Sequence, residues 1–336
     1  MHLSDFSTLV IIADNVAMNK TEVNVYSREV DMAYEKNVAY LKDGFEQFVD
    51  KVIIYSDPQA FMENVKLHKK DIIFPYWHGK SSRNKHALVA SICEIENLIY
   101  IGPDTYTNIV CCDKIISKDI CRLAGVKFPQ FVVINDEDEK FDWPYSLPAV
   151  VKPVYEGSSV GITQENIVHD IQQMESLARK LYKEFNQPIM VEEFIPGIEV
   201  NLAFVGWKDN IKVWSAARRV HLTDPLFFDK FLFAFSEKNL EDDIILTDAR
   251  DLISPELLHR LTNLFNWLDK IEYIRIDGKI YNNEFYCIEL TPDADLHPEG
   301  SFFSQLNYAG YNFTTALKLL VENCLERYNN LNPNQS

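Results

Sequence analysis

The sequence predicts an α/β protein that begins with a doubly wound parallel sheet. Short apolar runs alternate with longer segments of helical period, and this rhythm is typical of parallel strands joined by helices. The length of 336 residues favours two or three lobes over a single core. Hydrophobic residues make up 47% of the chain and charged residues 25%, which are ordinary values for a globular protein.

In the first part of the chain, apolar runs and amphipathic segments follow one another in turn. The expected strands are 9–13, 51–56, 71–79 and 99–103. The segments 29–48 and 87–98 place apolar residues on one helical face, so they predict helices between those strands. We expect this part to form an N-terminal Rossmann-like domain over residues 1–112.

The rest of the chain predicts further strands and a long closing helix. A helix over 114–125 ends at Gly125, with Pro129 just beyond it. The expected strands are 131–135, 149–154, 190–195, 201–207, 212–218, 272–280 and 285–291, and the expected helices are 167–185 and 312–328. We expect a central lobe over 113–196, a C-terminal lobe over 197–330 and a disordered tail over 331–336.

Composition and charge exclude several classes of partner. The net charge of −17 argues against nucleic acid, because phosphates would be repelled over most of the surface. No apolar run approaches the roughly 18 residues that span a bilayer, so we expect no membrane partner. The short apolar stretch near the start lacks a preceding basic segment, which favours a buried strand over a signal peptide. The six cysteines form no CxxC pair, and we expect reduced thiols in a cytoplasmic protein.

A lysine at a strand end opens the first segment that can carry chemistry. Lys152 ends an apolar run, and the loop 156–161 (EGSSVG) follows it. Glycine lets the backbone approach a ligand closely, exposed N–H groups and hydroxyls suit phosphate oxygens, and the lysine adds positive charge. The lysine precedes the glycines, so this is not the GxxxxGK[ST] loop. The pattern predicts a phosphate site, with an ordinary hairpin turn as the alternative.

Carboxylates around a Pro-Gly turn define the second segment, 191–199 (VEEFIPGIE). Glu192 and Glu193 precede the turn, and Glu199 follows it. A strand that passes into a linker in this way offers backbone groups to an adenine, and its carboxylates accept hydrogen bonds from ribose hydroxyls. The segment therefore predicts a nucleoside site, with a solvated charged turn as the alternative.

An arginine and two carboxylates form the third segment. Alternation places Arg275 and Asp277 on one face of a strand, and a turn at Asn282 and Asn283 brings Glu289 onto the neighbouring strand. Two carboxylates on one sheet face are costly unless a cation lies between them, and oxygen ligands suit Mg²⁺ carried in with a nucleotide. The arginine is suited to neutralise a phosphate or an oxyanion. A structural Arg–Asp pair is the alternative.

In this order the three segments resemble the D-alanine–D-alanine ligase branch of the ATP-grasp enzymes, over roughly residues 70–328. The most specific stretches are VVKPVYEGSSVGI and MVEEFIPGIEV, supported by GPDTYTNIVCCDKIISKDICRLAGVKFPQFVV and by YIRID followed by FYCIELTPDADLHPEGSFFSQ. The resemblance implies the ATP-grasp fold with a substrate-binding first domain. It also implies ATP-dependent joining of a carboxylate to an amine, between amino-acid-like substrates, through an acylphosphate. Mg²⁺, or Mn²⁺ in its place, would accompany ATP, and a homodimer is the default expectation.

The resemblance also implies a role for individual residues. Its ATP contacts fall on Lys114, Lys152, Glu156, Ser158, Ser159, Val160, Glu192, Phe194 and Glu199. Its metal ligands fall on Asp277, Glu289 and Thr291, in the C-terminal lobe. Its catalytic residues fall on Arg275, Glu29 and Ser158, where Glu29 would orient the ammonium of the first amino acid. Its substrate contacts fall on His78, Arg83, Gly300 and Ser301.

Three departures from the family pattern concern the substrate and the second metal. Thr291 stands where the family has an asparagine, and a hydroxyl is a poorer metal ligand. The loop after His78 is basic rather than acidic, and the family's mobile-loop lysine is replaced by an apolar residue, with Lys230 and Lys238 as substitutes. Two alternatives therefore stay open. One is an amino-acid or peptide ligase of a secondary-metabolite pathway whose substrate is not D-alanine, and the other is a catalytically impaired nucleotide-binding protein.

Overall fold

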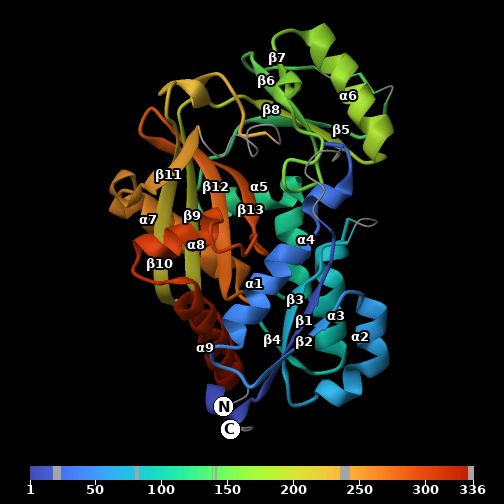
Figure 1. Ribbon diagram of the computed structural model, residues 1–336. Coiled ribbons are helices and arrows are strands. Elements are labelled where there is room, and N and C mark those ends of the chain that lie inside the picture. Colours follow the sequence, from blue (N-terminus) through green and yellow to red (C-terminus); the bar gives the residue numbers. More distant parts are fainter. Residues whose placement is uncertain (18–23, 80–82, 138, 141, 235–242, 332–336) are drawn as a thin grey trace.

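Three β-sheets organise the chain (Figure 1). The computed structural model describes residues 1–17, 24–79, 83–137, 139–140, 142–234 and 243–331. The first sheet is parallel and the other two are antiparallel, which confirms the predicted α/β class. In the described part of the chain, no helix is both long and apolar enough to cross a membrane. The predicted domain boundaries stay a prediction.

The first sheet is doubly wound, as the sequence predicts. Its strands stand in the order β2-β1-β3-β4 and run parallel. Their bounds, with those of the covering helices, are β1 Thr8–Ala13, β2 Lys51–Tyr55, β3 Ile72–Tyr76, β4 Ile99–Tyr100, α1 Glu35–Phe45, α2 Pro58–Asn64 and α3 Leu88–Ile95. Leu9 and Ile11 face the core that contains α1, whereas Val10 and Ile12 face the core that contains α2 and α3. Alternation along one buried strand therefore holds helices on both faces.

The first helix begins later than the period of 29–48 predicts. Arg28–Asp31 form a 3₁₀ turn, and the Ser27 hydroxyl accepts a hydrogen bond from the Glu29 amide at 3.3 Å. The α-helix starts only at Glu35, after an extended Tyr34. Asp31 is buried while Glu29 is exposed. The turn thus aims a different carboxylate inward from the one that a continuous helix would present.

The second sheet carries the segment in which the phosphate loop was predicted. Its strands stand in the order β5-β8-β6-β7 and pair antiparallel. The bounds are β5 Phe131–Ile134, β6 Ala149–Pro153, β7 Ile167–Val168 and β8 Ile189–Glu193. Helix α6 (Ile171–Phe185) covers one face and buries Met174, Ala178 and Leu181 against it (Figure 1). The carboxyl ends of the two central strands, β6 and β8, lead directly into the loops that line the site.

The third sheet has the order β11-β10-β9-β12-β13 and is also antiparallel. The bounds are β9 Ile198–Trp207, β10 Asn210–His221, β11 Ile244–Asp248, β12 Tyr273–Tyr281 and β13 Glu284–Thr291. Asn282 and Asn283 have φ of 51° and 62° and form the predicted hairpin turn between β12 and β13. Asparagine tolerates this left-handed conformation better than most residues, so the turn fixes the register of the two strands.

Several helices were not predicted from the sequence pattern. The additional helices are α4 Thr105–Cys112, α7 Pro255–Leu268 and α8 Ser301–Tyr308, while the predicted helices over 114–125 and 312–328 appear as α5 Lys114–Leu123 and α9 Phe313–Leu331. The predicted tail begins at the last residue of α9, and residues 332–336 lie outside the described part.

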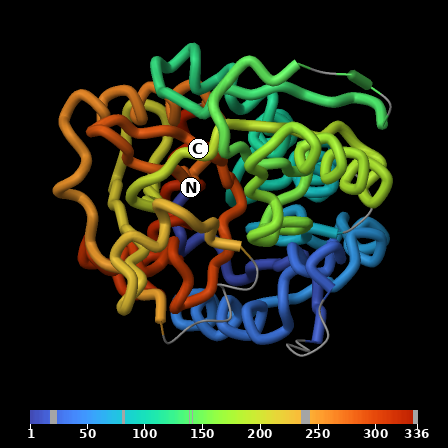
Figure 2. The backbone as a smooth tube through the Cα atoms, turned by 90° about the horizontal axis from the view of Figure 1, so that it is seen from above, coloured from blue at the N-terminus to red at the C-terminus, as the bar shows by residue number. Residues whose placement is uncertain are grey.

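The first and third sheets share one hydrophobic core. The cluster that contains Leu9 and Leu41 continues into Val205 of β9 and Leu320 of α9. The N-terminal ammonium donates to the Asn329 side chain at 2.6 Å, so the start of the chain lies beside the end of α9 (Figures 1 and 2). The second sheet has a separate core, to which Val30 and Tyr26 contribute from the described part of the N-terminal region. The first and third sheets therefore form one body.

A buried ion pair anchors α9 between these sheets. Arg327 pairs with Glu272, and the two side chains are 2% and 0% exposed. Glu272 also accepts a hydrogen bond from the Gly102 amide at 2.6 Å, and Arg327 donates to the Tyr100 carbonyl at 3.1 Å. Burial raises the pKa of Glu272 in spite of the arginine. The carboxylate therefore depends on its single charged partner.

We expect Arg327→Met to lower the free energy of unfolding by about 3–5 kcal/mol, because it leaves a buried carboxylate without a counter-charge. Urea denaturation measures the loss. Lys318→Met on the same helix is the control, since Lys318 is 48% exposed beside Glu322 and should cost no more than about 0.5 kcal/mol. Equal losses in the two variants would contradict the anchoring role.

Candidate active site

A cavity of about 910 Å³ lies where the three sheets meet. Its wall includes the predicted residues Lys114, Lys152, Glu156, Ser158, Ser159, Val160, Glu192, Phe194, Glu199, Arg275, Asp277, Glu289, Thr291, His78, Gly300 and Ser301. Glu29 and Arg83 do not line it. The fold thus brings residues separated by more than 200 positions to one place, with a volume typical of small-molecule sites.

Two predicted lysines enter this cavity from the second sheet and from α5. Lys152 lies on β6 and pairs with Glu192 of the adjacent strand β8, with both side chains buried. Burial lowers the pKa of Lys152 to about 8, and the neighbouring Lys118 and Lys114 act in the same direction. Lys114 at the start of α5 lies 2.9 Å from the Glu289 carboxylate and contacts the Glu156 carbonyl. Burial disfavours the charge of Lys114, but Glu289 outweighs burial and its pKa is raised.

Lys118 is a third buried lysine that the sequence analysis did not select. Its ammonium lies 3.0 Å from Glu192 and about 6 Å from the ring centres of Phe128 and Phe131. Lys118 follows Lys114 by one turn of α5, and this i, i+4 spacing was the available signal. Glu192 therefore holds two ammonium groups, one from the sheet and one from the helix.

The predicted phosphate loop has an unusual backbone. Ser158 and Ser159 have φ of 51° and 64°, in the left-handed region, and Gly161 follows with φ of 74°. The Val160 amide donates to the Gly157 carbonyl at 2.9 Å and closes a tight turn. Such strain persists where the surroundings fix it and is frequent at ligand sites. The loop belongs to the long connection 154–166 between the antiparallel strands β6 and β7, so it is not the two- to five-residue turn of an ordinary hairpin.

The Glu156 side chain at the start of the loop points away from the loop backbone. Its carboxylate accepts hydrogen bonds from Arg28 at 2.8 Å and from Gln187 at 2.7 Å. The Ser159 hydroxyl donates to the Phe233 carbonyl at 3.4 Å. The loop is thus tied to the N-terminal segment on one side and to the segment after β10 on the other.

The predicted metal segment lies on the β12–β13 hairpin in the expected register. Asp277 and Glu289 are direct partners across the two strands. Arg275 donates to both carboxylate oxygens of Asp277, at 2.7 and 2.8 Å, and the Thr291 hydroxyl donates to Asp277 at 3.3 Å. The Asp277 carboxylate also accepts from Asn201 at 2.5 Å. Burial opposes the charge of Asp277, but Arg275 outweighs it and lowers the pKa.

Arg219 on β10 is a further, partly buried cation of the cavity wall that sequence reasoning missed. Its guanidinium contacts Asn201 and stacks 4.0 Å from the centre of the Phe233 ring. Burial lowers its pKa. Phe233 lies in the segment where the family lysine is replaced by an apolar residue. Lys230 is exposed and does not line the cavity, and Lys238 lies outside the described residues. Arg219 and Phe233 are separated in sequence, so no local motif predicts this contact.

The predicted nucleoside segment lines the other end of the cavity. The Phe194 amide donates to the Pro148 carbonyl at 3.1 Å, which extends the strand past β8. The Lys279 ammonium lies 4.9 Å from the Phe194 ring centre and 3.9 Å from the Glu199 carboxylate. Burial raises the pKa of Glu199, and Lys279 opposes that effect. The segment therefore offers a ring, a carboxylate and backbone groups, not a solvated charged turn.

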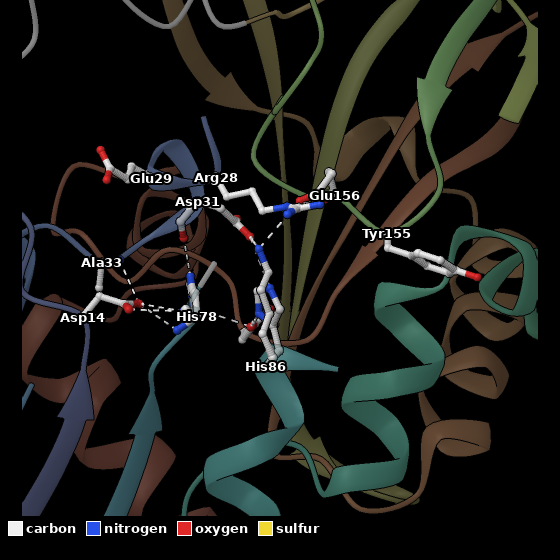
Figure 3. A network of polar contacts seen from close by, with 12 residues as sticks. Asp14, Arg28, Glu29, Asp31, Ala33, His78, His86, Tyr155 and Glu156 are labelled. Atoms are coloured by element: carbon white, nitrogen blue, oxygen red, sulfur yellow. Dashed lines mark hydrogen bonds and ion pairs between the residues drawn. The ribbon is translucent and has the colours of Figure 1, made fainter. Parts of the chain in front are cut away.

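The side of the cavity that the first part of the chain forms, with Asp31, His78 and His86, is called the N-terminal wall. It differs most from the prediction (Figure 3). Glu29 points away from the cavity, whereas Asp31 points into it. The Asp31 carboxylate lies 3.0 Å from Lys85 and 3.2 Å from the imidazole of His86. These partners lower its pKa although burial acts to raise it. Arg83 donates to the Tyr155 hydroxyl at 3.3 Å at the exposed rim.

A buried carboxylate holds the loops of this wall together. Asp14, which directly follows β1, accepts hydrogen bonds from the amides of His78 at 2.7 Å, Gly79 at 3.2 Å and Ala33 at 3.5 Å (Figure 3). Its position at the carboxyl end of a central parallel strand places it between the two loops. The ends of β1 and β3 are thereby fixed relative to the turn that carries Asp31.

Two histidines of the wall meet at Asp293. His86 contacts Asp293 through Nδ1, and His78 Nε2 lies 3.5 Å from the same carboxylate oxygen. Burial acts to lower the pKa of His86, but Asp293 and Asp31 outweigh it and raise the pKa to about 10. The same contacts lower the pKa of Asp293 to about 2. Asp293 is therefore engaged by the N-terminal wall, away from Thr291 and the hairpin.

Comparison with known proteins gives a consistent result. Residues 120–322 match the sequence model of a family described as D-ala D-ala ligase C-terminus. A D-alanine–D-alanine ligase from Campylobacter lari is 25% identical over 280 residues, which cover 82% of this chain and 75% of that protein. The crystal structure of a D-alanine–D-alanine ligase from Bacillus anthracis complexed with ATP aligns with a TM-score of 0.72 at 16% identity, over 95% of this chain and 98% of that one. For the VanG D-Ala:D-Ser ligase from Enterococcus faecalis the TM-score is 0.67 at 17% identity, over 95% and 99%.

The fold is that of the ATP-grasp ligases, with a parallel-sheet domain before two antiparallel sheets. The family model covers more than half of the chain, so the chain belongs to the D-alanine–D-alanine ligase family. It is an ATP-dependent ligase that forms a peptide bond. The predicted fold, family and enzyme class are confirmed.

We expect Lys118→Met to raise the pKa of Lys152 above its value of about 8, because a neighbouring positive charge is removed while Glu192 stays in place. The methionine keeps the contact with the phenylalanine rings. NMR titration of lysine side-chain ¹³Cε signals measures the shift. Lys127→Met is the control, since Lys127 is exposed and pairs with Glu284. A Lys152 pKa that is unchanged in Lys118→Met would show that the two ammonium groups do not interact.

Proposed function

We propose that this ligase joins two amino-acid-like substrates in the cavity between the three sheets, through an acylphosphate intermediate. One observation carries the assignment: five cationic side chains line the cavity, and all of them come from α5 or from the second and third sheets. Three are buried lysines, Lys114, Lys152 and Lys279, and two are partly buried arginines, Arg219 and Arg275. A site that collects positive charge at this cost suits a triphosphate and the charge that develops when it reacts.

We propose that the ATP phosphates displace the internal partners of the two lysines. Lys152 is held by Glu192 and Lys114 by Glu289, so both ammonium groups are already oriented in the cavity. Lys118 would keep Glu192 neutralised when Lys152 turns to a phosphate. The strained turn at Ser158 and Ser159 supports a role in covering the phosphates, and the segment at Phe194 and Glu199 supports a role in holding adenosine.

The carboxylate pair of the hairpin fits Mg²⁺. Asp277 and Glu289 face each other across β12 and β13, and the Thr291 hydroxyl lies beside them. An all-oxygen set of this kind suits Mg²⁺ rather than a softer ion. The ion would neutralise the β- and γ-phosphates. Arg275 would then be released from its bidentate contact with Asp277 to stabilise the oxyanions of the reaction.

The chemistry that we propose has two steps. A carboxylate oxygen of the first substrate attacks the γ-phosphorus, and the bond to the bridging oxygen of ADP breaks. The amine nitrogen of the second substrate then attacks the acyl carbon and loses a proton. The bond between the acyl carbon and the phosphate oxygen breaks, and phosphate leaves. The protein contributes positioning, charge neutralisation and exclusion of water. Ser158 and the loop around it close the side from which water would hydrolyse the acylphosphate.

We propose that Gly300 and Ser301 receive the carboxylate of the second substrate. Gly300 caps the N-terminus of α8, and Ser301 is its first helical residue. The free amides and the positive end of a helix favour an anion at this position. Both residues line the cavity on the side of the β12–β13 hairpin.

The N-terminal wall bears on the identity of the first substrate. The relatives are named for D-alanine and, in VanG, for D-serine as well. In this chain the carboxylate that faces the cavity from the N-terminal wall, Asp31, is already engaged by two partners, the Lys85 ammonium and the His86 ring. We therefore infer a first substrate other than D-alanine, as in a ligase of a secondary-metabolite pathway. The buried cations that serve the nucleotide argue against a catalytically impaired protein.

We propose a symmetric homodimer as the assembly. Exposed apolar side chains on neighbouring helices of the first part of the chain support it: Ile95 is 77% exposed and Tyr106 is 68% exposed. Apolar side chains of this size gathered on one side of a domain are typical of a surface that another chain covers.

The function is tested by phosphate release from Mg·ATP against a panel of D- and L-amino acids, singly and in pairs, with product masses recorded. We expect release that requires two substrates and a product equal in mass to their sum less water. D-Alanine alone should release phosphate poorly. Efficient turnover of D-alanine alone would contradict the inferred first substrate, and phosphate release without any condensed product would contradict ligation.

We expect Asp277→Asn to lower kcat/KM by about 10²-fold or more at a fixed Mg²⁺ concentration, and added Mg²⁺ to restore part of the loss. The Mg²⁺ dependence separates loss of a ligand from disturbance of Arg275, which would not respond to the ion. Glu284→Gln at the far end of β13 is the matched control, because its carboxylate pairs with Lys127 at the surface. A loss in Asp277→Asn that is independent of Mg²⁺ would remove Asp277 as a ligand.

A further inference from the structure

The N-terminal wall contains a cluster of ligand atoms that ATP-dependent ligation does not explain. His78 Nε2, His86 Nδ1 and an Asp293 oxygen lie within 4.8 Å of one another, and all three residues line the cavity. We propose that these three side chains bind a divalent transition-metal ion of the Zn²⁺ type, in addition to the Mg²⁺ that accompanies ATP.

The state of His78 is the first argument. Its Nδ1 lies 2.5 Å from the Asp31 backbone carbonyl, which only accepts, so Nδ1 carries the proton. Nε2 then presents a lone pair, and this atom is buried without a hydrogen-bond partner. It lies 3.5 Å from an oxygen of the Asp293 carboxylate. A buried nitrogen lone pair that faces an anionic oxygen is unfavourable unless a cation lies between them.

The second argument is that each ring nitrogen of His86 has a partner that suits a metal ligand. Its Nε2 lies 3.2 Å from the Asp31 carboxylate, to which it donates, and its Nδ1 faces Asp293. Histidines that bind metals nearly always donate their other ring N–H to a carboxylate or a backbone carbonyl, which fixes ring orientation and tautomer. Here Asp31 serves both histidines, through its carbonyl and its carboxylate. Lys85, at 3.0 Å, balances the charge of that aspartate.

The chemistry of the donors selects the class of ion. Two imidazoles and one carboxylate suit Zn²⁺ and its neighbours in the transition series, whereas Mg²⁺ takes oxygen ligands. Three protein ligands leave at least one coordination position of the ion free, and all three ligand residues line the cavity. An ion bound there would be able to hold a substrate oxygen or nitrogen.

A proton is the competing occupant of the same position. An imidazolium at His86 would donate to both Asp293 and Asp31 and would satisfy the two carboxylates without a metal. It would leave His78 Nε2 without a partner. The orphaned nitrogen therefore distinguishes the two accounts and favours the ion.

The test uses the full chain without a purification tag, freed of metal by a chelator and without nucleotide. Titration with Co²⁺ should give visible absorption bands at one ion per chain, and Zn²⁺ should abolish them by displacement. His86→Ala and His78→Ala should each weaken Co²⁺ binding about 10-fold or more. Asp293→Asn, which keeps the side-chain shape, should do the same and serves if a histidine variant does not fold.

Two controls locate the ion. His259→Ala removes an exposed histidine of α7 whose ring contacts only Asn263, and it should leave the titration unchanged. Asp277→Asn should also leave it unchanged, because the β12–β13 carboxylates are the Mg²⁺ position. Absence of tight Co²⁺ binding would show that a proton alone occupies the cluster, and binding that survives the His78, His86 and Asp293 changes would place the ion elsewhere. Either result overturns the proposal.

Discussion

The positions of the functional residues depend on one constraint, which is that positive charge must be buried before the nucleotide arrives. Desolvating an ammonium or a guanidinium is expensive unless an opposite charge lies nearby. The chain meets this need with partners from other elements: Glu192 of β8 for the lysine on β6, Glu289 of β13 for the lysine on α5, and Asp277 for Arg275. In the function proposed above, these same carboxylates are the groups that ATP and Mg²⁺ would rearrange.

The N-terminal wall also compensates a buried charge, but here the buried charge is negative. Asp31 is turned inward by a 3₁₀ turn, and Lys85 and His86 neutralise it from a second loop. Asp14 fixes both loops through backbone amides. The carboxylate of this wall is therefore already paired, whereas the antiparallel sheets direct cations into the cavity. The two sides of the cavity therefore differ in how their charges are compensated.

The sequence predicted those parts of the site in which function and local pattern coincide. Strand ends, a Pro-Gly turn and the Asn-Asn hairpin place Lys152, Glu192 and Asp277 with the correct register, because alternation and turn chemistry act over a few residues. The inward turn of Asp31 in place of Glu29 depends on a bend that helical period does not encode. Arg219 and Lys118 are paired with residues distant in sequence, and Lys118 was detectable only from its spacing to Lys114. The domain boundaries and residue roles stay predictions, since they depend on ligands and motions rather than on the fold.

The loops that follow β1 and β3 carry the wall to which we assign the first substrate, whereas strands and one helix start carry the residues that we assign to the nucleotide. This separation has an evolutionary consequence. Loops at the end of a parallel sheet tolerate insertion, deletion and charge reversal, while a strand register does not. Descendants of one ancestor can therefore exchange what is joined without altering how ATP drives the joining. A lineage of such enzymes would diversify in product while its energy-coupling machinery stayed constant.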